Sequence, residues 1–384
     1  NGGHCPPSVV EAIQKQAAEL LHICIHVATY EPYVALCEKL NQLLPHGSAT
    51  KTMLVNSGAE AVENAIKIAR QATGRTGIIC YTGAFHGRTM MGMSLTSKTG
   101  YKRSCGPFAP EIYRLPYPSY FHHGDGLSLK DFVRRELQRF EDAFLSYVPL
   151  ENTAAVIIEP VLGEGGFIPA PAEYLQGLRK ICDERGILLI ADEVQSGFCR
   201  TGRWAAYEHA GITPDLSTWA KSLGGGLPIG AVMGKADVMD AARPGTIGGT
   251  YGGNPVCCAG ALANIEFLER EDINRRAEEI GREVTRRFTA LSRKCSSIGG
   301  VRGLGAMIGM GFCHDRDPAR PAGDIVGRAA ALCREQNVLI LPAGAHGNIL
   351  RTLSPLVIED ADLSRALDVV EESVLAAVGQ VTAV

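Results

Sequence analysis

The sequence predicts an α/β protein built around a mostly parallel sheet, and three observations lead to this fold class. Short apolar runs alternate with amphipathic helical patterns through the middle of the chain, which is typical of βαβ units. Of the 384 residues, 46% are hydrophobic and 21% are charged, which favours a globular chain over a disordered one. The length is sufficient for about two domains.

The first predicted unit is a strand, a turn and a helix. Residues 51–55 form an apolar run that predicts a strand, and the following Asn-Ser-Gly-Ala at 56–59 predicts a turn. A helix is expected over 60–72, because apolar side chains recur there on one face. Gly74 would end this helix.

A complete strand–helix–strand unit follows in the middle of the chain. Residues 154–160 and 187–191 predict two buried strands. Between them, the stretch from Ala172 to Arg185 carries apolar residues at helical spacing, and Gly186 is suited to end that helix. Residues 216–220 predict a further strand of the same sheet.

The last third of the chain has a different character. A long, charged, amphipathic pattern over 261–291 predicts a connecting helix, and glycine-rich residues 301–312 predict a pair of strands. A helix near 324–336, a strand at 338–341 and a closing helix over 360–378 complete the expected order.

The change of pattern predicts two domains. We place the boundary near Phe267, so that residues 10–267 form a large domain and residues 1–9 and 268–384 form a small one.

Composition excludes several classes of function. The formal net charge is −3, without a run of Lys or Arg, which argues against a nucleic-acid or membrane-surface partner. No stretch approaches the ~18 apolar residues of a membrane span. Twelve cysteines without a C-x-x-C spacing are interpreted as reduced thiols, which predicts a cytoplasmic protein. The histidines are scattered, so no metal site is expected.

Two residues near the ends of predicted strands point to one chemistry. Asp192 follows a buried strand, where open α/β sheets bind ligands, and Lys221 lies between an apolar strand and three glycines. Pyridoxal phosphate requires both groups, a lysine as Schiff base and a carboxylate that pairs with its pyridinium nitrogen. The alternative is a helix-capping Asp192 and a surface Lys221, and the combination favours the cofactor.

The cofactor's phosphate requires a binding site. Ser57, Gly58 and Ala59 open a predicted helix, where free N–H groups and the helix dipole attract anions. This pattern by itself is common to strand–turn–helix junctions. Neither a G-x-x-x-x-G-K-[ST] motif nor a dinucleotide fingerprint occurs, so nucleotides are disfavoured.

Further charged and aromatic residues are candidates for substrate binding. Phe85 could stack on a flat ring, and Arg88 could bind a carboxylate, although a packed phenylalanine and a surface ion pair would look the same. Glu159 and Glu164 flank the end of a strand and a glycine-rich loop, and Arg351 lies in an apolar strand, where it needs a charged partner or ligand. Two arginines and a movable acid suggest a site for more than one acidic substrate.

Taken together, these motifs resemble the class III (ω-amino acid) aminotransferases of the fold type I pyridoxal-phosphate enzymes. The resemblance covers essentially the whole chain and rests on the segments 56–65, 85–89, 159–160, 163–166, 191–197, 200–202, 220–222, 249–251, 254–255 and 302–305. It implies a mostly parallel seven-stranded sheet flanked by helices, with a smaller α+β domain. It also implies an N-terminal segment before Asn1 that completes the small domain and the substrate pocket.

The resemblance implies a role for each cofactor residue. Lys221 would bind the cofactor covalently and carry a proton, and Asp192 would keep its ring nitrogen protonated. The other residues implied to contact the cofactor are Ser57, Gly58 and Ala59 at the phosphate, Phe85 and Val194 on the ring faces, Gln195 at the ring oxygen, and His86. Thr250 would reach the phosphate of a partner subunit, which implies a homodimer with shared active sites, possibly assembled into a tetramer. The position of Phe85 is often tyrosine in this family.

Substrate choice is also implied by the resemblance, which is strongest to the bacterial enzymes that act on 4-aminobutyrate and 2-oxoglutarate. The reaction would give succinate semialdehyde and glutamate. Arg88 would bind the carboxylate shared by both substrates, Arg351 the α-carboxylate of the dicarboxylate, and Glu164 would neutralise Arg351 when a monocarboxylate is bound. Glu159 is a further substrate-binding candidate.

Other functions stay open at this point. Within the family, the alternatives are the aminotransferases of 5-aminovalerate, ornithine or β-alanine and a decarboxylating relative acting on dialkylglycines. Outside it, the alternative is a regulatory module that binds the cofactor without turnover, but such a module has no need of Arg88 and Arg351.

Overall fold

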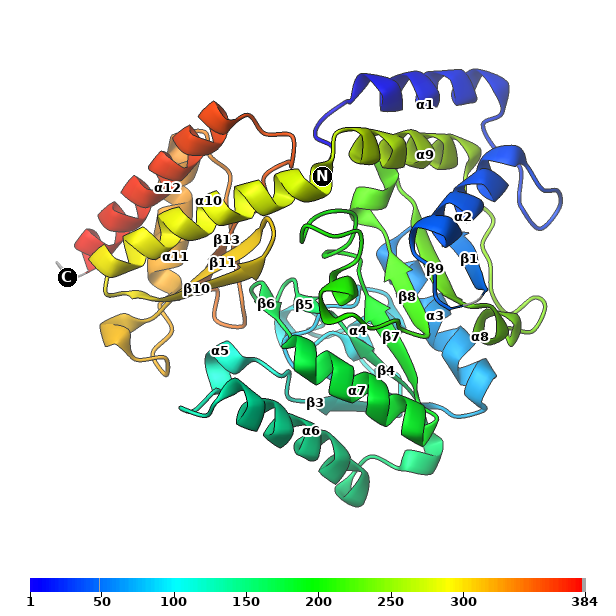
Figure 1. The fold of residues 1–384 in the computed structure, drawn as a ribbon, viewed down its shortest axis with the longest axis horizontal. Helices are drawn as coiled ribbons and strands as arrows, with labels where there is room; N and C mark the ends of the chain where they lie inside the picture. The colour runs from blue at the N-terminus through cyan, green and yellow to red at the C-terminus, as the bar shows by residue number, and fades with distance from the viewer. Residues whose placement is uncertain (48, 382–384) are drawn as a thin grey trace.

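The computed structural model describes residues 1–47 and 49–381, and these residues form two groups of elements. In Figure 1, the larger group surrounds a seven-stranded sheet, and the smaller group contains α10, α11 and α12 around a second sheet. The N-terminus lies at the junction of the two groups, whereas α12 ends at the far side of the smaller group.

The large sheet is parallel except for one strand. Its order is β1-β9-β8-β7-β4-β2-β3, and β9 runs antiparallel to both of its neighbours. The strands are β1 (Thr50–Val55), β2 (Gly77–Tyr81), β3 (Ile112–Leu115), β4 (Thr153–Ile158), β7 (Leu188–Asp192), β8 (Leu216–Trp219) and β9 (Gly230–Lys235). The predicted α/β class with a mostly parallel seven-stranded sheet is therefore confirmed.

Helices cover both faces of this sheet, so its central strands are apolar on both sides. Successive strand residues alternate between the two faces: Ile78 packs with α3, whereas Ile79 packs against α6 and α7. The flanking helices are α3 (Gly58–Thr73), α4 (Met90–Leu95), α6 (Leu129–Ser146), α7 (Ala172–Arg185) and α8 (Ala236–Asp240). Both α3 and α7 end at a glycine in the left-handed region, Gly74 (φ 67°) and Gly186 (φ 62°), as predicted.

Three helices cover the β1 and β9 side of the large group, and one of them, α9, leads into α10 of the smaller group (Figure 1). They are α1 (Pro7–Glu19), α2 (Glu31–Leu43) and α9 (Pro255–Arg270), and α9 packs against both of the others. The large group also contains the short helix α5 (Tyr120–His123) and the two-stranded sheet of β5 (Val161–Leu162) and β6 (Ile168–Pro169).

The smaller group packs helices on an antiparallel sheet of order β10-β11-β13-β12. Its core contains Phe288, Phe312 and Leu350. The elements are α10 (Ile273–Lys294), β10 (Ile298–Leu304), β11 (Met307–Phe312), α11 (Gly323–Glu335), β12 (Leu341–Ala343), β13 (Ile349–Arg351) and α12 (Asp360–Val381).

Three local predictions were wrong in detail. The predicted helix over 261–291 is two helices, because Asp272 adopts a left-handed conformation (φ 47°) between α9 and α10. Gly58 and Ala59, which were predicted in a turn, form the first residues of α3, because Ser57 caps the helix by accepting a bond from the Glu60 N–H. The strand predicted at 338–341 lies later, at β12, where it pairs with β13.

The division into domains near Phe267 stays a prediction, and this residue lies inside α9. All twelve cysteines are free thiols. Within residues 1–47 and 49–381, no helix combines the length and apolar character that a membrane span requires.

Parallel strands bring distant residues to one edge of the sheet. β1, β2, β4, β7 and β8 point the same way, so the residues that follow them meet at their carboxyl ends. Ser57, Phe85, Glu159, Asp192 and Lys221 each lie at or just beyond one of these ends. The common direction of the strands therefore brings these five predicted site residues to one edge.

A buried carboxylate, Asp215, ties the amino ends of β7 and β8 to the last residue of β9 and to α7. Asp215 lies 2.7 Å from Arg179 of α7 and 2.6 Å from Lys235 of β9, and it accepts a 2.7 Å bond from the Leu189 N–H. Burial alone would raise the pKa of Asp215, but the charge of Arg179 and the bonds from Lys235 and Leu189 outweigh it and lower the pKa. The carboxylate is thus ionised at neutral pH and stabilises the fold there.

We predict that Asp215→Asn lowers the free energy of unfolding at pH 7 by about 3 kcal/mol, because Arg179 loses its buried partner. Folding lowers the pKa of Asp215. The difference in the free energy of unfolding between the variant and the wild type should therefore shrink as the pH falls below about 4. Urea unfolding followed by circular dichroism measures both effects. The matched control is Asp183→Asn, because Asp183 also pairs with Arg179 at 2.7 Å but is 60% exposed. If Asp183→Asn lowers the free energy of unfolding as much as Asp215→Asn does, burial is not the reason for the effect of Asp215.

Candidate active site

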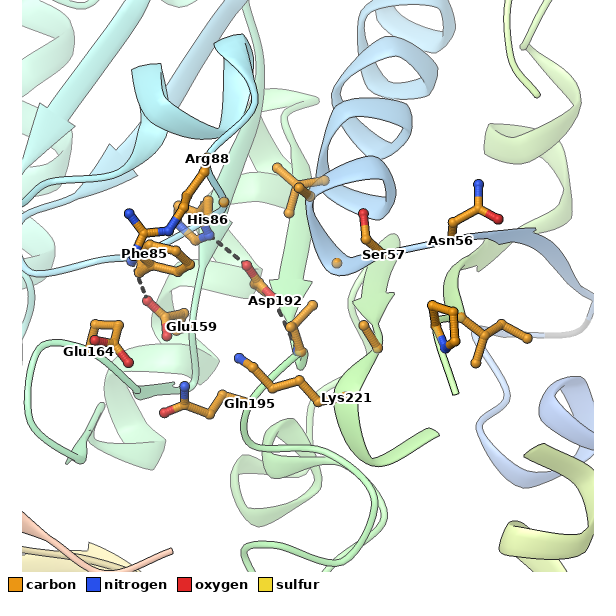
Figure 2. A pocket seen from close by; sticks show the side chains of 18 of the residues that line it. Asn56, Ser57, Phe85, His86, Arg88, Glu159, Glu164, Asp192, Gln195 and Lys221 are labelled. Atoms are coloured by element: carbon orange, nitrogen blue, oxygen red, sulfur yellow. Dashed lines mark hydrogen bonds and ion pairs between the residues drawn. The ribbon is translucent and has the colours of Figure 1, made fainter. Parts of the chain in front are cut away.

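A cavity of about 700 Å³ opens at the carboxyl edge of the large sheet. Figure 2 shows Lys221, Asp192 and Gln195 projecting toward the same space, with Ser57 on one side and Glu164 on the other. Of the predicted site residues, the cavity wall contains Ser57, Gly58, Ala59, Phe85, His86, Arg88, Glu159, Glu164, Asp192, Val194, Gln195 and Lys221. Arg351 joins this group through Glu164, and Thr250 does not line the cavity.

Asp192 is buried at the end of β7 and is held by three contacts. Its Oδ2 lies 2.6 Å from Nδ1 of His86, and its Oδ1 accepts bonds from the Thr218 hydroxyl at 3.0 Å and the Val194 N–H at 3.1 Å. The side chains of Asp192 and His86 are 3% and 0% exposed. A carboxylate so fixed can hold a positive charge at a defined place in the cavity.

Lys221 has an unusual backbone. It lies directly after β8, opens a short 3₁₀ turn (Lys221–Gly224), and has a φ of 46°, which is rare for a residue with a side chain. Its side chain lines the cavity and is exposed to it, while many protein atoms lie around the amine. Burial lowers the pKa of Lys221, and the nearby carboxylates of Asp192 and Glu159 oppose this shift. A lysine with a lowered pKa is suited to nucleophilic attack and proton transfer.

The N-terminus of α3 forms another wall of the cavity. Helix geometry leaves the first N–H groups of α3, at Gly58 and Ala59, without acceptors in the helix. A Cβ atom at Gly58 would lie 2.8 Å from the Val194 side chain, so only glycine lets the helix end approach Val194 this closely. This arrangement can hold an anion such as a phosphate.

Two buried polar atoms at the cavity have no partner among the described residues. They are Oε1 of Gln195 and Nε2 of His86. Buried polar atoms without a hydrogen bond are costly, so they indicate room for a ligand with polar groups. The cavity thus contains an amine that can form a covalent bond, a fixed carboxylate, a helix end that can bind an anion and an amide oxygen without a partner in the described part of the chain. Together these groups fit pyridoxal phosphate. No group of three or more His, Cys, Asp or Glu side chains within 1–47 and 49–381 is arranged to hold a metal ion.

An ion pair connects the large group to the small sheet at the cavity. Oε1 of Glu164 lies 2.8 Å from Nη2 of Arg351, and Nη1 of Arg351 donates to the Gly163 carbonyl at 3.2 Å. The Arg351 side chain is 6% exposed, whereas that of Glu164 is 22% exposed. Burial alone would raise the pKa of Glu164, but the Arg351 charge and the bonds from Tyr101 and Arg351 lower it. Arg351 thus has a charged partner, as its place in an apolar strand required.

Arg88 differs from Arg351 because it is exposed and forms no ion pair with a described residue. Its guanidinium lies 5.6 Å from the centre of the Phe85 ring and 4.5 Å from that of the Tyr101 ring. Aromatic faces attract a cation but leave its N–H groups available. Arg88 is therefore ready to bind a carboxylate from the cavity.

Glu159 ties two loops of the site together. Its Oε1 accepts a bond from the Phe85 N–H and its Oε2 one from the Gly163 N–H, both at 2.8 Å. Burial raises the pKa of Glu159 to about 7. Its contacts position the Phe85 and Gly163 loops, and the substrate contact expected from the sequence stays a prediction.

Tyr101 and Thr218 contact predicted site residues but were not assigned to the site from the sequence. Thr218 of β8 lies opposite Asp192 of β7. A correct prediction of the register between these two strands could therefore have identified it. Tyr101 lies in a 3₁₀ turn (Thr99–Tyr101) without a recognisable motif, and nothing in the sequence indicated its contact with Glu164. Thr250 is exposed next to Tyr251 in a turn outside the cavity, and its predicted contact with a partner subunit stays a prediction.

Comparison with known proteins identifies the family. The family model of aminotransferase class III matches residues 1–374. The chain is 46% identical to 5-aminovalerate aminotransferase DavT of Pseudomonas putida and 43% identical to 4-aminobutyrate aminotransferase GabT of Escherichia coli, in each case over 97% of this chain and 86% of the relative.

Solved structures agree with this assignment. A PLP-bound amine transaminase from an uncultivated Pseudomonas species superposes with a TM-score of 0.92 at 29% identity, covering 98% of this chain and 88% of the other. The ornithine aminotransferase of Toxoplasma gondii gives 0.84 at 30% identity, covering 98% and 84%. The chain therefore belongs to the class III aminotransferases and is a pyridoxal-phosphate-dependent enzyme.

Proposed function

We propose that this enzyme transfers the amino group of 4-aminobutyrate, or of its homologue 5-aminovalerate, to 2-oxoglutarate. The products are the corresponding semialdehyde, which is succinate semialdehyde for 4-aminobutyrate, and glutamate. The observation that carries the proposal is the ion pair of Glu164 with the buried Arg351, beside a second arginine, Arg88, that is free to bind a carboxylate.

The chain's own groups fit the cofactor as follows. Bound pyridoxal phosphate supplies an electron sink for the charge that develops when a substrate C–H proton is removed. Asp192, positioned by His86, Thr218 and Val194, would hold the ring nitrogen in its protonated form. The remaining contacts would come from Ser57, Gly58 and Ala59 at the phosphate, Phe85 and Val194 at the ring faces, and Gln195 at the ring oxygen.

Lys221 would act as base and acid in the proton transfer. Its Nζ would take the proton from the substrate carbon that carries nitrogen and give it up to the cofactor within the same half-reaction, and in the second half-reaction it would carry a proton in the opposite direction. The lowered pKa of Lys221 supports this role, because a larger fraction of the side chain is neutral near physiological pH.

Two arginines and one acid account for substrates of unequal charge. Arg88 would bind the carboxylate present in both substrates. With 4-aminobutyrate bound, Arg351 would keep Glu164 as its partner, because a buried arginine without a counter-ion is costly. With 2-oxoglutarate bound, the second carboxylate would replace Glu164 at Arg351, which lets one pocket accept both molecules.

The assembly is also part of the proposal. A homodimer would bring Thr250 of one subunit to the cofactor phosphate of the other. Exposed apolar side chains support such a contact surface near Thr250: Tyr251 is 61% exposed, and its ring centre lies 4.6 Å from that of His22, whose neighbour in sequence, Leu21, is 64% exposed. Free cysteines support a cytoplasmic location.

The choice of amino donor is tested by a screen of the cofactor-loaded enzyme. We expect 4-aminobutyrate and 5-aminovalerate to convert the cofactor to its amine form faster than β-alanine, ornithine or 2,2-dialkylglycines, as measured by the change in visible absorbance. The first two should differ by no more than about 200-fold, since they differ by one methylene. A clear preference for ornithine or a dialkylglycine would refute the proposed donor.

We predict that Lys221→Ala lowers turnover at least about 1,000-fold, because both the covalent link and the proton carrier are lost. The absorbance band of the covalently held cofactor should disappear, while the far-ultraviolet circular dichroism stays unchanged. The control is Lys39→Ala, which removes a surface ion pair with Glu269. An unchanged absorbance band in Lys221→Ala would refute the assignment of this lysine.

We predict that Arg351→Ala harms the 2-oxoglutarate half-reaction about 30-fold or more, because a buried charge partner of the α-carboxylate is lost. The 4-aminobutyrate half-reaction should change much less, since that substrate has no α-carboxylate. Single-turnover measurements of each half-reaction give the two values. Arg365→Ala, an exposed arginine of α12, is the control. Equal losses in both half-reactions would contradict the exchange of partners at Arg351.

A further inference from the structure

Tyr101 forms a hydrogen bond with Glu164, the acid that would move when a dicarboxylate binds. Its hydroxyl donates to Oε2 of Glu164 at 2.7 Å, while Oε1 of the same carboxylate lies 2.8 Å from Nη2 of Arg351. Each oxygen of Glu164 therefore has one donor, and the two donors come from parts of the chain far apart in sequence. The carboxylate has both bonds only while it stays beside Arg351.

The ring of Tyr101 contacts the other arginine. The guanidinium of Arg88 lies 4.5 Å from the ring centre, and Nζ of Lys98 lies 5.5 Å from it. The Phe85 ring meets Tyr101 edge to face at 5.2 Å. The ring is thus held by Arg88, Lys98 and Phe85, which limits how far its hydroxyl can follow Glu164 if that side chain moves away.

We propose that Tyr101 is a positioning residue that sets the balance between the two substrate classes, by holding Glu164 on Arg351 and Arg88 in the cavity wall. This inference rests on the proposed function. The hydroxyl bond stabilises the arrangement that a monocarboxylate ω-amino acid needs, in which Glu164 neutralises Arg351. The same bond opposes a dicarboxylate, which has to displace Glu164.

The charge states at neutral pH are consistent with this role. The pKa of Tyr101 is raised, first by burial and then by its bond to Glu164, so the hydroxyl keeps its proton. The pKa of Glu164 is lowered despite burial, because of the Arg351 charge and the bonds from Tyr101 and Arg351. The contact therefore joins a neutral donor to a charged acceptor, which is stronger than a neutral pair.

Hydrogen bonds hold the backbone of Glu164 in place, so that a movement of this residue involves its side chain only. The Glu164 carbonyl accepts a 3.0 Å bond from the Gly344 N–H, and the Gly344 carbonyl accepts a 3.2 Å bond from Nζ of Lys98. Lys98 and Tyr101 lie in the same segment, so that segment contacts both the side chain of Glu164 and the loop that holds its backbone. A rotation of the Glu164 side chain then breaks the Tyr101 bond without moving the loop.

The test is Tyr101→Phe in the cofactor-loaded enzyme, because this change removes the hydroxyl and keeps the ring. We expect kcat/KM for the ω-amino acid half-reaction to fall about tenfold, and that for 2-oxoglutarate to stay within about twofold or to rise. Glutarate, an unreactive dicarboxylate, should bind several-fold more tightly by isothermal titration, since Glu164 is easier to displace.

Three further variants make the interpretation specific. Tyr113→Phe is the matched control, because the Tyr113 hydroxyl also donates to a glutamate, Glu111, at 2.6 Å but lies outside the cavity; no change is expected. In a Glu164→Ala background, Tyr101→Phe should have no further effect on the ratio of the half-reactions, because its partner is gone. Tyr101→Leu also removes the aromatic ring that the Arg88 guanidinium contacts. Because Arg88 would bind the carboxylate of both substrates, KM should rise for both.

Two results would overturn the inference while leaving the proposed function intact. One is an equal loss in both half-reactions of Tyr101→Phe with unchanged glutarate affinity. The other is an effect on the ratio that persists in the Glu164→Ala background. If the wild-type enzyme processes none of the ω-amino acids with 2-oxoglutarate, the proposed function itself fails, and this is measured before any variant is made.

Discussion

The site depends on one constraint, the common direction of β1, β2, β4, β7 and β8 in a sheet covered on both faces. Because these strands are parallel, the residues that follow them meet at one edge, although they are spread over much of the sequence. The covered faces also exclude water from the floor of the cavity, so charges placed there interact strongly. Asp192 and Lys221 have their chemical properties because of this position.

Asp192 and Arg351, two buried charged residues of the site, differ in how their charges are paired. Asp192 has fixed partners in His86 and Thr218, which suit a group that must hold one charge state throughout a reaction. Arg351 has a partner that, under the proposed function, a substrate would replace, because Glu164 approaches it from a turn and is partly exposed. The difference follows from the elements that supply the partners: strands β7 and β8 pair in register, whereas the Glu164 turn only meets the small sheet.

Under the proposed function, the small sheet contributes to specificity more than to chemistry. Arg351 lies on β13, and Gly344 follows β12, so two of the contacts of Glu164 come from this sheet or its flanking loop. A shift of the small group relative to the large one would change the Glu164 and Arg351 contact directly, and would leave the contacts of Asp192 unchanged. Relatives that share the cofactor residues can thus differ in substrate through this boundary.

The sequence by itself determined the α/β class, the bounds of α7 with its terminal Gly186, and the combination of Asp192 and Lys221 near strand ends that pointed to the cofactor, because these depend on periodicity, on glycine geometry and on local motifs. Tertiary structure alone decided the break at Asp272, the register that brings Thr218 to Asp192, and the contact of Tyr101 with Glu164, 63 positions away. The physical reason is that a local pattern reports which face of an element is buried, whereas a hydrogen bond between distant side chains exists only after the strands and turns that carry them have packed.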